Sequence, residues 1–203
     1  MAFSYSWKPL RSIPDLIPAC IKIMKEEWPH CKAEILPQLV ERELGSAPCS
    51  YGLVEQQKDM TDQIALVGHV RFIPVTNRRR AVYAEGFIID KERRKRGVGL
   101  LATSLGERMA SKYEYRELFK SIYPHFKEFY LERSFSVSKD HLSTVGANVL
   151  LTNNPRGEGP TYVSWHGNTL YPGWEWVYEG GVIASKTDLT DEQSGLLVKK
   201  LLS

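Results

Sequence analysis

The chain has 203 residues, of which 42% are hydrophobic and 25% are charged, and its net charge is +3. This length and composition predict one globular domain with a sizeable core and exclude a largely disordered protein. The small net charge excludes a protein whose whole surface serves a polyanionic partner, so any function of its basic residues must be local.

The cysteines and the apolar runs bear on the compartment. Cys20, Cys31 and Cys49 are odd in number and show no CxxC spacing, so we expect no metal site, no disulfide framework and a reducing, cytoplasmic setting. The first 16 residues lack a basic segment followed by an apolar run, so we expect no secretory signal. No apolar stretch reaches the roughly 18 residues of a membrane helix, so no membrane partner is expected.

The first predicted elements are two helices. Residues 14–28 place apolar side chains at helical spacing, and Pro29 limits the helix. Residues 33–45 repeat the pattern and end on a glycine that is typical of a helix stop. A strand over 49–56 and a polar turn or loop over 57–63 follow.

The clearest strand pattern comes next. Residues 64–75 and 81–90 are strand-like runs joined by residues 76–80, which is the layout of an antiparallel hairpin. Glu85 lies inside the second run, where a carboxylate is unusual. We expect this hairpin to lie at the centre of a sheet, with the charged residue Glu85 inside it.

After Asp90 the pattern changes to mixed elements. Residues 97–113 predict a helix, 118–123 a strand and 124–135 a short helix. Turn formers and aromatics alternate in the tail, which predicts strands or loops, and residues 195–202 favour a strand over a helix. This order predicts an α/β domain with a mixed central sheet flanked by helices.

The stretch KERRKRGVGLL, residues 91–101, follows a strand and opens a helix. Helix N-termini bind anions through unpaired N–H groups and the helix dipole. Gly97 and Gly99 lack the Cβ atoms that would keep a pyrophosphate from the backbone, and residues 94–96 add positive charge. The motif indicates a phosphate site, with a solvated basic helix cap, a nuclear import signal or a nucleic-acid surface as alternatives.

Residues 81–109 resemble the acetyl-CoA-binding core of the GCN5-related N-acetyltransferase (GNAT) superfamily. In that superfamily a central strand feeds a (Q/R)xxGx(G/A) loop that cradles the CoA pyrophosphate. Arg94, Gly97 and Gly99 fill the three defining positions. The resemblance implies the GNAT fold over residues 1–203, with a cofactor core at about 64–135.

A second motif extends the resemblance. The segment FYLERSF is similar to the superfamily's FYxxxGF, with Phe129, Tyr130 and Phe135 matching and Ser134 standing where glycine is usual. The remaining residues, 136–203, are then expected to complete the sheet and form a wall for the acceptor. The resemblance also implies acetyl-CoA as co-substrate, held by the loop and by the preceding strand. The implied contacts are Phe87, Ile88, Ile89, Arg94, Lys95, Arg96, Gly97, Val98 and Gly99.

Two residues are the candidate catalysts. Glu85 is the candidate base. An N-terminal amine has a pKa near 8, against about 10.4 for a lysine side chain, so a carboxylate can deprotonate an N-terminal amine more easily than a lysine. The alternative for Glu85 is to face solvent or to pair with Arg71 on the neighbouring strand. Tyr130 matches the superfamily's tyrosine beside the thioester sulfur, and its alternative is packing. His69 is a second base or a structural histidine.

The acceptor is expected to be a protein N-terminus. The segments EEWP and VGHVRF and the strand with Glu85 are similar to the branch of the superfamily that acetylates processed actin, which has an acidic N-terminus. Arg71, with His69 and Trp28, is the first candidate for contacting it. Further cationic candidates are Lys32, Arg42, Arg78, Arg79 and Arg80.

Other functions remain open from the sequence. The acceptor could instead be a small amine such as a polyamine, or the chain could be a non-catalytic CoA-binding module. A nucleic-acid partner is not expected, given the small net charge. The tail aromatics could close over an acceptor or cover the sheet; they are Tyr162, Trp165, Tyr171, Trp174 and Trp176.

Overall fold

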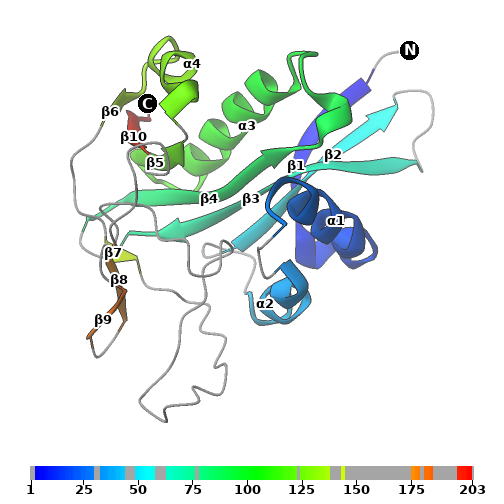
Figure 1. Ribbon diagram of the computed structural model, residues 1–203, viewed down its shortest axis with the longest axis horizontal. Coiled ribbons are helices and arrows are strands. Elements are labelled where there is room, and N and C mark those ends of the chain that lie inside the picture. Colours follow the sequence, from blue (N-terminus) through cyan, green and yellow to red (C-terminus); the bar gives the residue numbers. More distant parts are fainter. Residues whose placement is uncertain are drawn as a thin grey trace.

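Figure 1 shows the computed structural model as a central sheet with helices on both faces. The residues that the structure describes are 3–29, 33–43, 49–57, 63–75, 78–122, 124–137, 143–144, 175–178, 181–184 and 196–202. Among them the main sheet has seven strands, in the order β1-β2-β3-β4-β5-β10-β6. These strands are β1 (Phe3–Pro9), β2 (Cys49–Gln57), β3 (Ile64–Pro74), β4 (Ala81–Ile89), β5 (Glu117–Ile122), β6 (Ser136–Val137) and β10 (Leu196–Leu201).

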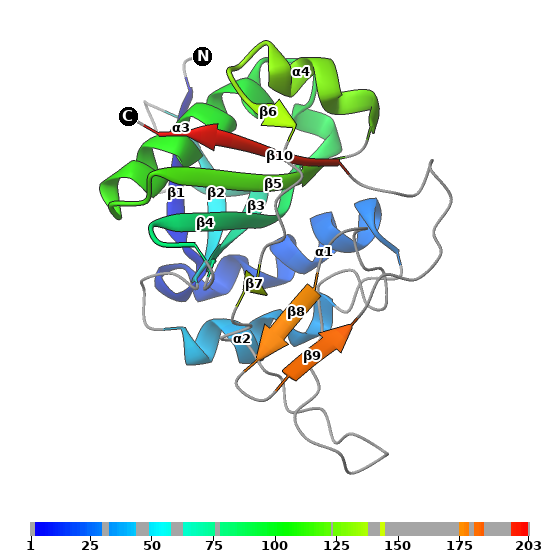
Figure 2. The ribbon, with the colours of Figure 1, turned by 90° about the vertical axis from the view of Figure 1, so that its left-hand side faces the viewer.

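The sheet is mixed. Strands β1 to β4 pair in antiparallel fashion, β4 and β5 are parallel, and β10 lies antiparallel between β5 and β6. Figure 2 shows β10 beside β5 although the two are far apart in the sequence. The predicted α/β class, the hairpin and the C-terminal strand are confirmed. A second, small sheet contains β7 (Ser143–Thr144), β8 (Glu175–Tyr178) and β9 (Gly181–Ala184).

The helices cover opposite faces of the main sheet, α1 and α2 on one and α3 and α4 on the other (Figure 1). Their bounds are α1 (Ile17–Glu27), α2 (Leu36–Arg42), α3 (Val98–Lys112) and α4 (Lys127–Leu131). Short 3-10 turns precede several of them, so the predicted helices are shorter than expected. These turns are η1 (Leu10–Ser12), η2 (Pro14–Leu16), η3 (Ala33–Ile35), η4 (Lys91–Arg93) and η5 (Pro124–Phe126).

Two apolar layers hold the helices to the sheet. Leu66 of β3 and Ile88 of β4 pack with the buried side chains of α1 and α2. On the other face Phe72 and Ala84 pack with residues of α3 and α4. Removal of this apolar surface from water is the main driving force for the arrangement.

Strand β1 is not predicted above. It pairs along its whole length with β2 at the edge of the sheet. Its sequence alternates Phe3, Tyr5 and Trp7 with small or polar residues, which is the period of a strand with one apolar face. The Trp7 indole Nε1–H donates a hydrogen bond of 3.0 Å to the carbonyl of Ala102 in α3, so the edge strand is tied to the helix above it.

A bulge in β4 shapes the middle of the sheet. His69 of β3 pairs with Ile88, but Arg71, two residues on, pairs with Glu85, three residues back. Gly86 has a φ of 59°, which glycine adopts without steric cost. The His69 ring donates from Nδ1 to the Gly86 carbonyl at 3.0 Å. Burial lowers the pKa of His69 to about 4, so the ring is neutral near pH 7 and suited to this bond.

The bulge comes where β4 leaves β5. Pairing between these parallel strands covers Ala81 to Ala84 on β4 and Glu117 to Lys120 on β5. Strand β4 continues to Ile89 without that partner. Because a bulge bends its strand, the two strands separate beyond this point.

Candidate active site

The loop after β4 forms a helix start with free N–H groups. The Asp90 side chain accepts a hydrogen bond of 3.0 Å from the Glu92 N–H and so caps the turn η4. Gly97 then takes the left-handed conformation, with φ 79°, at the N-cap of α3. Its carbonyl accepts the Leu101 N–H at 3.0 Å. The N–H groups of the first turn have no partner within the helix, as at any helix N-terminus.

The space beside this helix start fits a phosphate group. A Cβ atom built on Gly97 or on Gly99 would meet no atom within 4 Å. Lys95 and Arg96 are exposed beside it and supply positive charge. Open space, unpaired N–H groups and cations together match the chemistry of the pyrophosphate in CoA.

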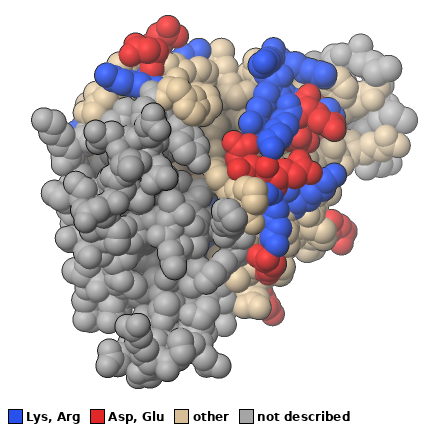
Figure 3. Space-filling model, viewed as in Figure 1, with Lys and Arg blue, Asp and Glu red and all other residues tan. Residues whose placement is uncertain are grey.

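Two arginines of the same run make hydrogen bonds and ion pairs within the protein. Arg93 forms a bidentate contact with the carboxylate of Glu55, at 2.9 to 3.2 Å, and Tyr5 donates to that carboxylate at 2.7 Å. Arg94 donates to the Ile89 carbonyl at 2.9 Å and to Glu27 Oε2 at 2.8 Å. Basic and acidic side chains are accordingly interleaved on the face shown in Figure 3, so the basic run does not form one field of positive charge.

A cavity of about 460 Å³ lies where β4 and β5 separate. It is lined mainly by apolar and aromatic groups, which is typical of small-molecule sites. Its lining includes nine of the residues singled out from the sequence, namely Trp28, Phe87, Ile88, Ile89, Arg94, Lys95, Gly99, Phe129 and Tyr130. The cavity therefore joins the phosphate loop to the exposed edge of β4 and to α4.

Aromatic residues form part of the cavity lining, among them Phe129 and Tyr130 of α4. Tyr130 is buried and lies edge-to-face with Phe129 and Phe135, each with ring centroids 5.1 Å away. Burial raises the pKa of the Tyr130 phenol far above its usual value. Ser134, where the GNAT pattern has glycine, has a φ of 63°, so the position requires the left-handed conformation.

Glu85 and Arg71 lie together on the other face of the sheet. Both are 3% exposed and sit directly opposite each other on β4 and β3. Arg71 Nη2 lies 3.5 Å from Glu43 Oε1, and Glu43 accepts two hydrogen bonds of 2.8 Å from Ser50. Burial lowers the pKa of Arg71, while the charges of Glu43 and Glu85 oppose that shift. Neither Glu85, Arg71 nor His69 is among the residues that line the cavity.

Of the other cationic candidates, the three that the structure describes, Arg78, Arg79 and Arg80, do not line the cavity. Arg78 pairs with Glu117 at 2.8 Å, and Arg79 and Arg80 are exposed in the β3–β4 hairpin. Lys32 and the side chain of Arg42 lie outside the described residues. So do Tyr162, Trp165, Tyr171, Trp174 and the side chain of Trp176.

Three charged residues of the site are not predicted above. Glu27 and Lys120 line the cavity, and Glu43 joins the buried cluster around Arg71. Lys120 carries a signal that could have found it, because it is a charge inside the apolar run LFKSIY. Glu27 and Glu43 are ordinary helix-end residues in the sequence, and only the tertiary structure gives them partners.

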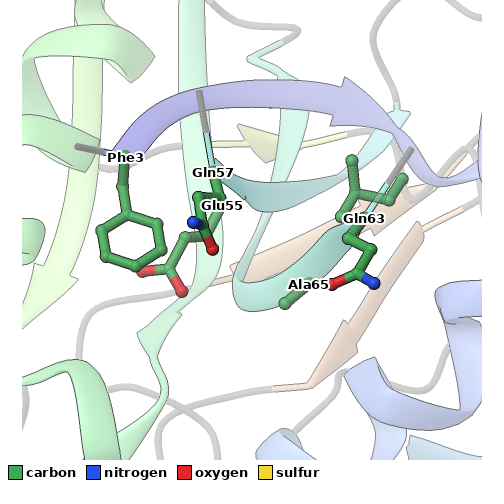
Figure 4. A pocket seen from close by; sticks show the side chains of 6 residues that line it. Phe3, Glu55, Gln57, Gln63 and Ala65 are labelled. Atoms are coloured by element: carbon green, nitrogen blue, oxygen red, sulfur yellow. The ribbon is translucent and has the colours of Figure 1, made fainter. Parts of the chain in front are cut away.

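A second hollow, of about 470 Å³, opens at the β1–β2–β3 end of the sheet (Figure 4). Its lining includes Phe3, Gln57, Gln63 and Glu55. The Glu55 carboxylate is already bound by Tyr5 and Arg93. Among the described residues no group of three or more His, Cys, Asp or Glu side chains is arranged to hold a metal ion. No described helix is both long enough and apolar enough to cross a bilayer.

Comparison with solved structures identifies the architecture. An N-acetyltransferase candidate from Lactobacillus plantarum matches over 100% of both chains at 12% identity, with a TM-score of 0.54. GCN5 from Tetrahymena matches over 98% of this chain and 96% of its own at 11% identity, with a TM-score of 0.53. The chain has the GNAT fold. The predicted fold is thereby confirmed.

A third neighbour with the GNAT fold is a spermidine N-acetyltransferase chimera from Vibrio cholerae and a human enzyme. The match covers 68% of this chain and 82% of the chimera at 13% identity, with a TM-score of 0.51. A search against protein-family models finds no match. At these identities the likeness concerns the fold, so the activity has to be argued from the site.

Proposed function

We propose that the protein is an acetyl-CoA-dependent N-acetyltransferase. The observation that carries the proposal is the continuity between the open helix start at Gly97 and Gly99 and the cavity between β4 and β5. A helix N-terminus with flanking cations binds a pyrophosphate, and an apolar cavity beside it suits the pantetheine chain.

The chain's own groups divide the work of binding. The first-turn N–H groups of α3, with Lys95 and Arg96, would hold the pyrophosphate. The backbone of Phe87, Ile88 and Ile89, which has left β5, would bind the chain that leads to the thioester. When bound, acetyl-CoA supplies an activated acetyl group. Preorganised N–H donors at the developing oxyanion are typically worth about 10²–10³ in rate each.

Glu85 is the proposed base, and Tyr130 is proposed to lie beside the leaving sulfur and to donate a hydrogen bond to it. Glu85 directly precedes the bulge, between two residues that line the cavity, Ala84 and Gly86. Arg71, directly opposite on β3, attracts the charge of this carboxylate. Tyr130 lines the cavity from α4 and can offer its hydroxyl as a donor.

We further propose a protein N-terminus as acceptor, with acidic, actin-like ends as the specific class. The support is the EEWP, GHVR and Glu85 pattern together with Trp28, which lines the cavity at the end of α1. Arg71 and His69 are buried, so their proposed contribution is to hold Glu85 and the bulge in place. A small amine is the second candidate, because a spermidine N-acetyltransferase shares the fold.

The test is a panel of acceptors with purified protein and acetyl-CoA, followed by CoA release and product mass. The panel holds peptides with acidic, neutral and basic N-termini, a peptide with a blocked N-terminus and an internal lysine, and spermidine. Turnover of acidic N-termini alone supports the full proposal. Turnover of spermidine alone keeps the reaction and rejects the acceptor. Binding of acetyl-CoA without turnover of any acceptor points to a binding module.

A further inference from the structure

Lys120 occupies an unusual place in the cavity. It lies on β5 opposite Ala84, the last pair before β4 and β5 separate. The residue is 3% exposed and lines the cavity. A lysine is almost never this deeply buried without a partner or a function.

Aromatic rings surround its ammonium group. Lys120 Nζ lies 4.0 Å from the ring centroid of Phe87, 5.3 Å from that of Tyr130 and 5.7 Å from that of Phe135. The described residues include no carboxylate in an ion pair with it. Cation–π attraction thus holds the amine against the wall where Tyr130 lies.

The charges that face Lys120 come from two elements. Glu107 on α3 attracts the ammonium, and Lys200 on β10 repels it. Glu107 and Lys200 pair with each other at 2.7 Å, so the carboxylate is shared. From α4, the Tyr130 phenol is neutral at ordinary pH, since burial raises its pKa. Burial is the largest effect on Lys120 and lowers its pKa to about 7.

These surroundings make Lys120 a better acid than Tyr130. A general acid is most effective when its pKa lies near the working pH. A thiol has an ordinary pKa of about 8.5, so a leaving thiolate takes a proton readily from an ammonium of pKa about 7. The phenol of Tyr130 would be a far weaker donor.

We propose that Lys120 is the acid that protonates the leaving sulfur, with the ring of Tyr130 as its wall; this rests on the proposed acetyl transfer. The acceptor nitrogen forms the new C–N bond with its lone pair, and the C–S bond breaks with its electron pair on sulfur. Nζ of Lys120 gives one proton to that sulfur and becomes neutral. The acceptor nitrogen loses one proton to Glu85, and both groups return to their starting states through solvent.

The test compares Lys120→Met with Tyr130→Phe, and uses Lys112→Met, an exposed lysine at the end of α3, as the matched control. We expect Lys120→Met to lower kcat on the order of 10²–10⁴-fold, the range for a lost general acid, and Tyr130→Phe to lower it less than about tenfold. Acetyl-CoA affinity should stay within about threefold of wild type in all of them, measured by calorimetry. A kcat near wild type for Lys120→Met, or a larger loss for Tyr130→Phe, overturns the proposal.

A second readout does not depend on turnover. The thiol of CoA bound to the protein is titrated by the ultraviolet absorbance of its thiolate. Below about pH 7, where Lys120 is still an ammonium, it favours the thiolate, so the thiolate absorbance there should be lower in Lys120→Met than in wild type and unchanged in Lys112→Met. An unchanged absorbance in Lys120→Met contradicts the proposal while leaving acetyl transfer intact. If wild-type protein binds neither CoA nor acetyl-CoA, the proposed function fails and this assignment fails with it.

Discussion

Buried basic residues have different surroundings on the two faces of the sheet around β4. On one face Arg71 lies between two carboxylates, Glu43 and Glu85, and Glu43 is further bound by Ser50. On the other face Lys120 is surrounded by aromatic rings at the wall of a cavity. Both positions are buried to the same extent.

This difference indicates that Arg71 stabilises the fold, whereas Lys120 can exchange a proton in the cavity. A buried cation between carboxylates is compensated, and its loss leaves those carboxylates uncompensated. A buried cation among rings loses its proton more easily, because burial lowers the pKa of an amine and the nearby carboxylate of Glu107 is paired with Lys200. We therefore expect substitutions on the first face to change stability and substitutions on the second to change binding and rate.

The largest expected effect is on the compensated face. Arg71→Met should lower the free energy of unfolding by about 3–5 kcal/mol, because it leaves Glu43 and Glu85 buried without their cation. Urea denaturation checks this. Arg79→Met, an exposed residue in the hairpin, is the control and should stay within about 0.5 kcal/mol of wild type. Equal stability of the two variants would remove the distinction between the faces.

Glu85 is expected both to stabilise Arg71 and to act as the base in the reaction. Glu85→Gln keeps the size of the side chain and removes the base, so kcat should fall on the order of 10²–10³-fold with acetyl-CoA binding unchanged. Steady-state kinetics with the best acceptor and calorimetry with acetyl-CoA measure the two quantities. A variant that is destabilised but keeps its kcat would show that Glu85 serves only to compensate Arg71.

The phosphate loop should show an effect on binding alone. Gly99→Leu places a side chain in the open space beside α3 and should weaken acetyl-CoA binding on the order of 100-fold, the equivalent of one or two lost charge-assisted hydrogen bonds. Stability should not fall, because leucine has a higher helix propensity than glycine. Calorimetry measures the affinity for acetyl-CoA, and thermal unfolding measures the stability. Unchanged affinity would place the pyrophosphate elsewhere.

A further expected effect is a pH dependence of stability that belongs to Lys120. Its pKa is about 7 in the folded protein, against 10.5 for an ordinary lysine side chain, so between these values the unfolded chain binds more protons. Wild-type stability relative to Lys120→Met should therefore decrease as the pH falls from about 10.5 to about 7, with a slope approaching one proton. Urea denaturation at several pH values measures it. A flat difference would mean that Lys120 keeps an ordinary pKa.

The sequence predicts most of the fold because its signals are local. The 3.6-residue and two-residue periods identify the helices and central strands, and the RxxGxG spacing identifies the loop at Gly97 and Gly99. The bulge also has a local signal, since Gly86 is an isolated glycine inside a strand. Strand β1 had the aromatic alternation of an edge strand.

The site was harder to predict because it depends on contacts between distant segments. Arg94 meets Glu27 across 67 positions, and Lys200 meets Glu107 across 93. No spacing rule relates such pairs. The surroundings of Lys120 combine rings from β4, from α4 and from the turn after it, so its lowered pKa follows from tertiary structure alone.

The most direct measurement of the central claim is hydrogen–deuterium exchange with and without acetyl-CoA. We predict protection of the backbone amides in the first turn of α3 and in residues 86–89, which are the groups assigned to the pyrophosphate and to the chain that leads to the thioester. Strand β2, on the far side of β3, should exchange equally in both samples and serves as the internal reference. Protection confined to other segments, or none at all, would contradict the account.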